Sequence, residues 1–345
     1  MWNMNIFAIE TSCDETSASV VLNGLKVKSV VIYSQIKIHA GFFGVVPELA
    51  SRSHIENINL VIWRALSDAG INFTDFSQKI DALAFTSGPG LAGALLVGAI
   101  AAKSLACVYK KPLIPVNHLD GHLYSSLIEN RSVKLPFLSL IISGGHTELV
   151  VVEDFGKYKV LGSTRDDAAG EAFDKAAKML GLSYPGGPII DKIAESGNPE
   201  AVRFTRPYLK GSWDFSFSGI KTALLNYLKT NPVRNEKQLN DICASFRQAI
   251  AETLCFKSFE AAKKFNLKRI VLGGGVSANS LIRKIFLETG QKNNTKVFIP
   301  SLIYSTDNAA MIGCAAYFKQ KKCGLKYDNI QLKPNPSLPL ENWRL

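Results

Sequence analysis

The segment NIFAIETSCDETSASVVL, residues 5–22, contains two apolar runs separated by a short polar stretch. Short apolar runs bounded by polar turn residues are typical of β-strands, so this segment predicts a β-hairpin. The polar stretch, residues 11–17, carries hydroxyl, thiol and carboxylate groups. The tip of the hairpin therefore holds side chains that can take part in chemistry.

The same arrangement returns in FLSLIISGGHTELVVV, residues 137–152, where two apolar runs flank a turn of serine, glycine and histidine. A second pattern also occurs twice: an apolar strand leads into a glycine turn and then a helix, at residues 80–108 and at residues 269–287. Two repeated patterns indicate two similar units. We therefore expect an α/β protein of two facing lobes, with the hairpin tips and the glycine turns at one cleft.

We expect the boundary between the lobes near residues 110–112, where a basic, proline-marked stretch ends the first of these helices. The N-terminal α/β lobe would then comprise residues 1–111 and the C-terminal α/β lobe residues 112–345. A largely helical insertion is expected at about residues 165–265 of the C-terminal lobe.

The composition is that of a globular protein, and 345 residues suffice for two lobes with their own cores. The six cysteines form no Cys-x-x-Cys pair, which argues against zinc fingers and iron-sulfur clusters and fits reduced thiols. The first residues lack the basic flank and cleavage site of a secretion signal. The longest apolar stretch, residues 91–102, is too short to span a bilayer. We therefore expect a cytoplasmic protein without a membrane segment.

The formal net charge of +11 is unusual for an enzyme of small anionic metabolites. A strongly basic protein is attracted to polyanions, so the charge favours RNA as a partner. A solvated surface in a lysine-rich proteome explains the same charge equally well.

Glycine turns between a strand and a helix bring backbone N–H groups close to a ligand, and the helix N-terminus favours negative charge. The run Gly273 to Gly275 has this setting. Glycines also serve tight packing, but four polar or glycine turns follow apolar strands in this chain. Together they favour a phosphate or nucleotide cleft.

His118 and His122 are four residues apart, so they share one face of a helix if a helix begins near Asn117. This is the spacing of a metal-binding pair, and Asp307, at the start of a later helix, can supply a third ligand. A metallopeptidase would need glutamate directly after the first histidine, where this chain has Leu119. Iron(II) and zinc both accept two histidines and one carboxylate. The structural alternative is two histidines packed on a helix and an aspartate that caps another helix.

Glu171 and Asp174 are three residues apart and share a helical face. Such acids usually belong to a solvated face. Beside a nucleotide, however, a carboxylate accepts hydrogen bonds from ribose hydroxyl groups, so a ribose-binding role is also open.

Together these motifs resemble the tRNA N6-adenosine threonylcarbamoyltransferase family in its bacterial form, formerly called O-sialoglycoprotein endopeptidases. The motifs that carry the resemblance are IETSCDETS at 9–17, HLDGH at 118–122, SGGHT at 143–147, GEAFDK at 170–175, YPGGP at 184–188 and GGGVSAN at 273–279. They run through nearly the whole chain in the right order.

The resemblance implies the two-lobed α/β superfold of actin, sugar kinases and heat-shock ATPases, with a ligand cleft between the lobes. It implies transfer of a threonylcarbamoyl group from threonylcarbamoyl-AMP to the exocyclic amine of the adenosine 3′ of the anticodon, in tRNAs that read ANN codons, with release of AMP. It also implies companion proteins, namely a smaller paralogue of the same fold and a small ATPase.

By the same resemblance, His118, His122 and Asp307 bind one Fe²⁺ per subunit, with zinc as the alternative. Substrate contacts are implied at Ile141, Ile142, Ser143, Gly144, Gly145, Asp174, Gly187, Asp191 and Asn279. To these we add Asp14 and Glu15, at the first hairpin tip, as the candidate catalytic pair that positions the acceptor amine or accepts its proton.

Two other functions fit the same superfold: a kinase or acyl-phosphate enzyme, and a non-catalytic nucleotide-binding module. A kinase would use Mg²⁺ and a catalytic carboxylate, so the pair of His118 and His122 speaks against it. The metal content of the purified protein would separate the transferase from both alternatives.

Overall fold

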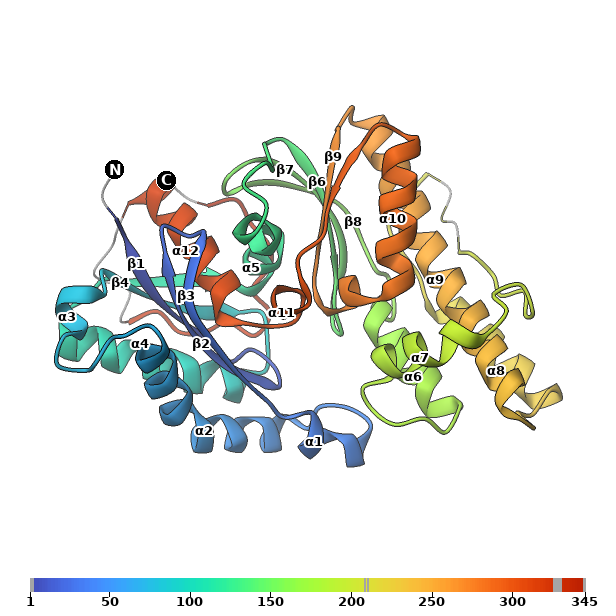
Figure 1. Cartoon of the computed structure of the whole chain (residues 1–345), viewed down its shortest axis with the longest axis horizontal. Helices are drawn as coiled ribbons and strands as arrows, with labels where there is room; N and C mark the ends of the chain where they lie inside the picture. The colour runs from blue at the N-terminus through green and yellow to red at the C-terminus, as the bar shows by residue number, and fades with distance from the viewer. Residues whose placement is uncertain (1–2, 208, 210, 325–330, 344–345) are drawn as a thin grey trace.

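Two five-stranded sheets form the framework of the protein (Figure 1). The computed structural model describes residues 3–207, 209, 211–324 and 331–343. The first sheet has the order β3-β2-β1-β4-β5, with β1 Asn5–Glu10, β2 Glu15–Leu22, β3 Lys26–Ser34, β4 Ala82–Gly88 and β5 Leu113–Asn117. The second has the order β10-β9-β6-β7-β8, with β6 Phe137–Ile142, β7 Thr147–Asp154, β8 Lys157–Ser163, β9 Arg269–Gly273 and β10 Lys296–Phe298.

The two sheets share one plan. Each begins with an antiparallel meander, β1 to β3 or β6 to β8, and continues with parallel strands, β4 and β5 or β9 and β10. The hairpin expected from residues 5–22 forms in the register Ile6 opposite Val21 through Glu10 opposite Ser17. The repetition in the sequence is therefore a repetition of structure.

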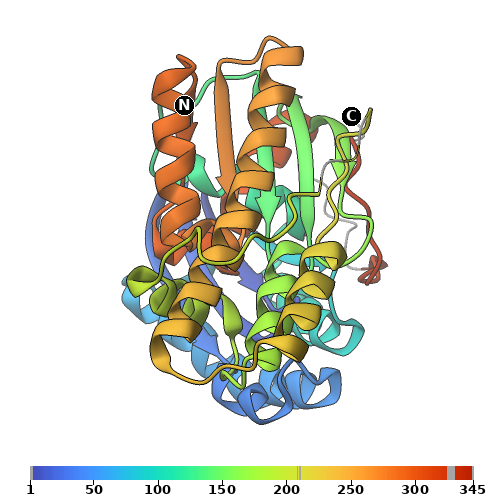
Figure 2. The same cartoon turned by 90° about the vertical axis from the view of Figure 1, so that its right-hand side faces the viewer.

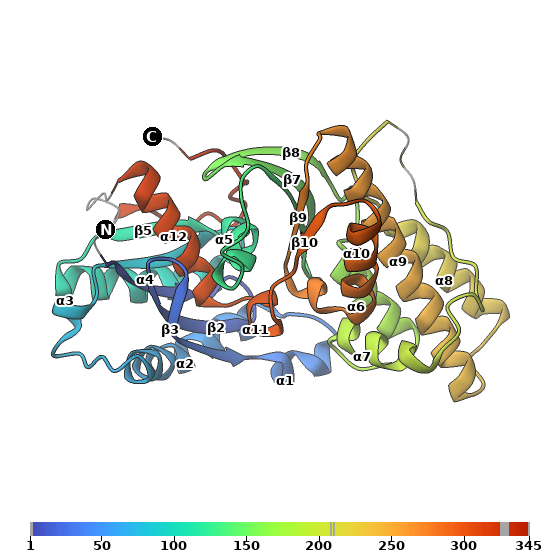
Figure 3. The ribbon, with the colours of Figure 1, turned by 45° about the horizontal axis from the view of Figure 1, so that its top comes forward.

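The helices lie in layers about the two sheets (Figure 1, Figure 3). They are α1 Ile36–His39, α2 Pro47–Asp68, α3 Phe76–Lys79, α4 Ala92–Tyr109, α5 His118–Tyr124, α6 Ala169–Met179, α7 Gly186–Ile193, α8 Ser218–Thr230, α9 Glu236–Lys264, α10 Ser280–Lys292, α11 Leu302–Ser305 and α12 Ala309–Cys323. Helices α2 and α4 share a core with one face of the first sheet. Helices α5 and α12 share a core with the opposite face and with one face of the second sheet, so they lie between the sheets.

The far face of the second sheet is covered by α6 to α10, seen face-on in Figure 2. Alternate residues of each strand point to opposite faces, so Leu138 and Leu140 of β6 join this outer core while Ile141 faces the inner one. Apolar strands covered on both faces agree with the continuous apolar runs of the sequence.

Helix α4 packs on the first sheet through small residues. A Cβ added at Gly98 would lie 2.3 Å from the Thr11 Oγ1 atom, so only glycine allows this approach. Ala99, Ala102 and Ala106 join the core with β4 and α2. By length and composition alone, α4 is the one helix among the described residues that could cross a membrane.

The division between the lobes differs from the boundary expected after residue 111. Strand β5 pairs with β4 in the first sheet, and the backbone carbonyl of Pro112 accepts a hydrogen bond from the Leu83 N–H at 2.9 Å. Helix α12 packs on β1 and β2 although it lies near the C-terminal end. The basic, proline-marked stretch is therefore the connection between α4 and β5 within one lobe, and the first lobe is completed by a late segment.

Residues 331–343, which we call the C-terminal strap, lie across both lobes. Its backbone and side-chain contacts join Asn335 N to Ser87 O, Gly90 N to Pro336 O, Asn117 Nδ2 to Pro339 O, Tyr158 N to Asn342 Oδ1, Trp343 N to Gly156 O and Trp343 Nε1 to Asp120 Oδ2. The strap thus connects the glycine turn after β4, the start of α5 and the turn between β7 and β8.

Replacing Trp343 by phenylalanine removes the indole N–H that lies 2.8 Å from the buried carboxylate of Asp120. We expect Trp343→Phe to lower the free energy of unfolding by about 1 to 3 kcal/mol, because a buried acceptor loses its donor. Thermal unfolding measures the effect. The control is Trp63→Phe on α2, where the side chain is 56% exposed. Equal midpoints for both variants would mean that the strap does not hold α5.

Candidate metal centre and substrate site

Helix α5 begins directly after β5, at a cap that the sequence provides. The side-chain oxygen of Asn117 accepts a hydrogen bond from the Leu119 N–H at 2.8 Å, and the Asn117 amide donates to the C-terminal strap. Asparagine is among the preferred residues at this position. His118 and His122 follow one turn apart on the same face, as the spacing predicts.

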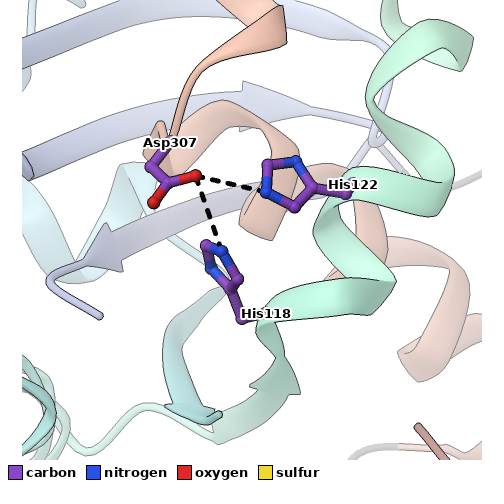
Figure 4. A group of neighbouring side chains, drawn as sticks. All are labelled: His118, His122 and Asp307. Carbon is purple, nitrogen blue, oxygen red and sulfur yellow. Dashed lines mark ion pairs between the residues drawn. The ribbon is translucent and has the colours of Figure 1, made fainter. Parts of the chain in front are cut away.

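His118, His122 and Asp307 meet between the two sheets (Figure 4). One ligand atom of each lies within 4.8 Å of the others. The Asp307 Oδ1 atom is 3.5 Å from His118 Nε2 and 3.2 Å from His122 Nε2. Asp307 does not cap α12, because Asn308 occupies that position and accepts from the Met311 N–H at 3.0 Å. The capping alternative for Asp307 is therefore wrong.

Glu10 orients His118. Its fully buried carboxylate lies 3.0 Å from His118 Nδ1, which directs Nε2 toward Asp307. The Thr86 hydroxyl donates to the same carboxylate at 2.6 Å, and the Ser12 N–H donates at 2.5 Å. A carboxylate behind a histidine in this way fixes the ring and its tautomer in metal sites.

The charges around His118 favour a cation. Burial acts to lower the pKa of His118, but the charges of Asp307 and Glu10 outweigh it and raise the pKa to about 9. Burial likewise acts to raise the pKa of Glu10, and the charge and hydrogen bond of His118 hold it below its usual value. Two carboxylates facing one imidazole therefore keep a positive charge at this point.

His122 is fully buried. Its Nε2 atom contacts the Asp307 carboxylate, whereas its Nδ1 atom makes no hydrogen bond to another described residue. Buried polar atoms normally have a partner. A metal about 2.1 Å from each ligand atom would separate neighbouring ligands by about 3.0 to 3.4 Å, close to the observed spacing around Asp307. These three residues therefore fit a metal with three protein ligands and open positions.

Asp14 and Glu15 lie at the first hairpin tip, where β1 turns into β2. Asp14 is buried, and burial together with the charges of Asp14 and Asp307 raises the pKa of Glu15 well above its usual value. The charge of Asp14 also raises the pKa of Asp174 in the second lobe. The tip therefore lies in electrostatic range of the metal candidates and of the opposite lobe.

The turn from Ser143 to Gly145 forms the tip of the second hairpin. The Ser143 N–H donates to the His146 carbonyl at 2.8 Å, and the Ser143 carbonyl accepts from the Gly170 N–H at 3.2 Å. A Cβ added at Gly144 or Gly145 would meet no atom within 4 Å. Glycine is therefore not needed there for packing, and the backbone is open to a ligand.

Asp174 of α6 holds the following turn. Its carboxylate accepts from the Gly186 N–H at 2.7 Å, and burial raises its pKa to about 6. Gly187, beside it, has only the Phe173 Cβ atom within 4.0 Å of an added Cβ. Glu171 instead pairs with Lys175 at 2.8 Å and is part of the solvated face. The two acids expected on one face thus have different surroundings.

Asp191 and Asn279 support helix α10. Asp191 pairs with Arg247 at 2.7 Å and accepts from the Ser280 N–H at 2.9 Å. The Asn279 side-chain oxygen caps α10 by accepting from the Ile282 N–H at 3.1 Å, which leaves its amide group for a ligand. Ile141 and Ile142 have fully buried side chains, so only their backbone could contact a substrate.

The two glycine turns that were expected at one cleft have different surroundings. In the first lobe the Gly90 N–H donates to the Pro336 carbonyl of the strap, and an added Cβ at Gly88 would collide with Asn335. In the second lobe an added Cβ at Gly273 would lie 2.4 Å from the His122 carbonyl oxygen, whereas Gly275 is open. Of these two glycine turns, only the one of the second lobe keeps an open glycine for a phosphate.

Two residues of the centre were not expected from the sequence. Glu10 ends an apolar strand. A carboxylate at the end of an apolar strand was the feature of the sequence that could have indicated its role. The pKa of His146 is lowered to about 4, first by burial and then by the charges of His118 and His122, so His146 lies near the metal candidates as a neutral ring. Two surface hollows, of about 390 and 740 Å³, lie along residues 199–207 and α9, away from all of these residues.

The layered pair of sheets recurs in solved structures. Component A of the (R)-2-hydroxyglutaryl-CoA dehydratase of Acidaminococcus fermentans aligns with a TM-score of 0.53 and 14% identity over 92% of this chain and 99% of that one. HypF of T. kodakarensis aligns with a TM-score of 0.62 and 14% identity over 96% of this chain and 49% of that one. The fold and the site define a two-lobed α/β protein of the actin and sugar-kinase-like ATPase fold with a histidine and aspartate centre between its sheets.

The sequence comparisons are more specific. A sequence model of the family described as tRNA N6-adenosine threonylcarbamoyltransferase matches residues 26–314. Relatives of that name are 51% identical over 333 residues in Clostridium perfringens, covering 96% of this chain and 97% of the relative, and 50% identical over 338 residues in Moorella thermoacetica, covering 97% of each. The chain belongs to the tRNA N6-adenosine threonylcarbamoyltransferase family.

We expect His118→Ala and His122→Ala each to remove most of the bound metal, because two remaining ligands hold an ion weakly. Glu10→Gln should weaken metal affinity about 10- to 100-fold, because outer-shell partners have effects of that size. Elemental analysis and competition with a chelator measure both. His39→Gln, at a buried histidine bonded to Gln35, is the control and should keep the metal. Unchanged metal content in both alanine variants would contradict the metal centre.

Proposed function

We propose that the chain transfers a threonylcarbamoyl group from threonylcarbamoyl-AMP to the exocyclic amine of the adenosine 3′ of the anticodon, in tRNAs that read ANN codons, and releases AMP. The observation that carries the proposal is the buried cluster of His118, His122 and Asp307 beside the open turn at Gly144 and Gly145. A kinase or a non-catalytic module has no observation in its favour, since the curated relatives are named as transferases.

His118, His122 and Asp307 would hold one Fe²⁺ per subunit, with zinc as the alternative for the same ligand set. A metal with open positions orients an acyl donor and polarises its carbonyl oxygen. Glu10 contacts His118 Nδ1, so Nε2 would be the ligand atom.

The second lobe would bind the adenylate. The backbone of Ser143, Gly144 and Gly145 can approach the phosphate, and its N–H groups would stabilise the charge that develops as AMP leaves. The Asp174 carboxylate, which accepts from the Gly186 N–H, would also accept from the ribose hydroxyls. Gly187 and the Asn279 amide, with the backbone of Ile141 and Ile142, complete the proposed contacts, while Asp191 supports them through Arg247 and Ser280.

The acceptor amine would enter from the side of the first hairpin tip. An aromatic exocyclic amine is a poor nucleophile, so it needs an activated acyl donor and exact placement. Asp14 and Glu15 are the candidates to position the amine or accept its proton. The excess positive charge would attract tRNA in the cytoplasm, and we expect the companion proteins, a smaller paralogue and a small ATPase, to be needed for turnover.

Asp174→Asn should weaken the binding of a non-hydrolysable adenylate analogue by about 1.5 to 3 kcal/mol, because a neutral amide replaces a charged acceptor. The asparagine oxygen can still accept from Gly186, so the turn should remain in place. Calorimetry measures the affinity, and metal content should not change. The control is Glu171→Gln on the same helix, which should bind like the parent. If Asp174→Asn and the parent bind the adenylate analogue with equal affinity, Asp174 has only a structural role.

With threonylcarbamoyl-AMP and the companion proteins supplied, the chain should modify an unmodified tRNA with adenosine 3′ of the anticodon. Mass spectrometry of the digested nucleosides reports the product. The rate at limiting tRNA should fall steeply with salt, because lysine and arginine contacts to phosphates release counterions. Product formation without the chain would refute the proposed function. A rate indifferent to salt would refute only the role of the positive charge.

A further inference from the structure

The loop of residues 40–46, between α1 and α2, exposes two neighbouring aromatic side chains. Phe42 is 59% exposed and Phe43 is 47% exposed. Large apolar side chains are usually buried on folding. Two adjacent exposed aromatic rings in one loop are therefore unusual. The loop is therefore a candidate surface for contact with a flat, apolar partner.

The base of this loop is fixed beside the first hairpin tip. The Gln35 N–H donates to the Asp14 carbonyl at 3.0 Å. The fully buried His39 ring lies 3.2 Å from the Gln35 side-chain oxygen and accepts from the Val46 N–H at 3.3 Å. The two ends of the loop are thus held together through one buried imidazole, next to a candidate catalytic residue.

Phe43 has a backbone conformation that its side chain disfavours. Its φ is +55°, in the left-handed region, where a bulky residue is an outlier. Unfavourable backbone conformations persist where the surroundings impose them, and they gather at functional sites. Glycine would adopt this φ without strain. The Phe43 side chain is therefore present at an energetic cost to the backbone.

The tip of the loop reaches the opposite lobe. The Lys178 ammonium group lies 5.5 Å from the centroid of the Phe43 ring, and Lys178 is one helical turn after Asp174 on the same face of α6. Figure 1 and Figure 3 show α1 extending from the first lobe toward α6 and α7. The loop therefore spans from Asp14 to helix α6, one turn beyond Asp174, beside the proposed entry of the acceptor.

We propose that Phe42 and Phe43 form a platform on which unpaired bases next to the target adenosine stack, and this inference rests on the proposed function. Unpaired RNA bases are recognised by stacking on aromatic side chains, and each stacked base adds affinity without sequence preference. The exposed Lys178 ammonium group, 5.5 Å from the Phe43 ring centroid, can contact an adjoining phosphate.

The test uses the full-length chain and an anticodon stem-loop RNA. Phe43→Gly removes the ring and relieves the left-handed strain, so its thermal midpoint should equal or exceed that of the parent. Phe42→Ala removes the other ring. Each variant should bind the RNA at least about fivefold more weakly, with unchanged affinity for an adenylate analogue. The control is Phe73→Ala, where a 42% exposed ring lies beyond the far end of the 22-residue α2.

RNA affinities equal to that of the parent for Phe42→Ala and Phe43→Gly would overturn the proposal. A lower thermal midpoint for Phe43→Gly together with weaker adenylate binding would also overturn it, because the ring would then be structural. Loss of companion-protein binding with RNA affinity intact would overturn it as well. Transfer assays with the companion proteins separate this failure from that of the proposed function. If the parent modifies tRNA and both variants do so with its KM for tRNA, only the platform fails; if the parent does not, the proposed function fails first.

Discussion

The contact between the Glu10 carboxylate and the His118 ring holds the two halves of the site in one geometry. Glu10 ends the central strand of the first sheet, and His118 begins the helix that lies between the sheets. A fully buried carboxylate is costly unless it is well paired, and here Thr86 and the Ser12 backbone supply further donors. Because His118 Nδ1 contacts Glu10, the opposite ring nitrogen Nε2 faces Asp307. The position of strand β1 therefore fixes the direction of a candidate ligand atom on α5.

The duplicated plan of the lobes does not produce duplicated chemistry. Both lobes have a hairpin tip, and both have a glycine turn between a parallel strand and a helix. In the first lobe the strap and Ser12 take up the N–H groups of Gly90 and Leu91. In the second lobe Gly144, Gly145 and Gly275 remain open. The first lobe therefore contributes carboxylates and packing, whereas the second offers backbone to a ligand.

The sequence predicts those parts of the structure that have a local signal. The alternation of apolar runs and polar turns was sufficient for both hairpins, and the four-residue spacing was sufficient for the histidine pair on α5. The role of Glu10, the strap and the return of α12 to the first sheet depend on contacts between residues far apart in the chain, which have no periodicity. Residues 110–112 show the limit most clearly, because a proline and two lysines mark a turn but not whether the next strand joins the same sheet.

The order of the elements along the chain has a consequence for synthesis. Strands β1 and β2, which carry Glu10 and the first hairpin tip, leave the ribosome well before Asp307, α12 and the strap. Domains generally fold as units during translation, starting from the N-terminal one. Here one face of the first sheet lacks its covering helix until residues 309–323 have emerged. The nascent first lobe therefore exposes apolar surface throughout the translation of the second. The cluster of His118, His122 and Asp307 can form only after Asp307 has emerged.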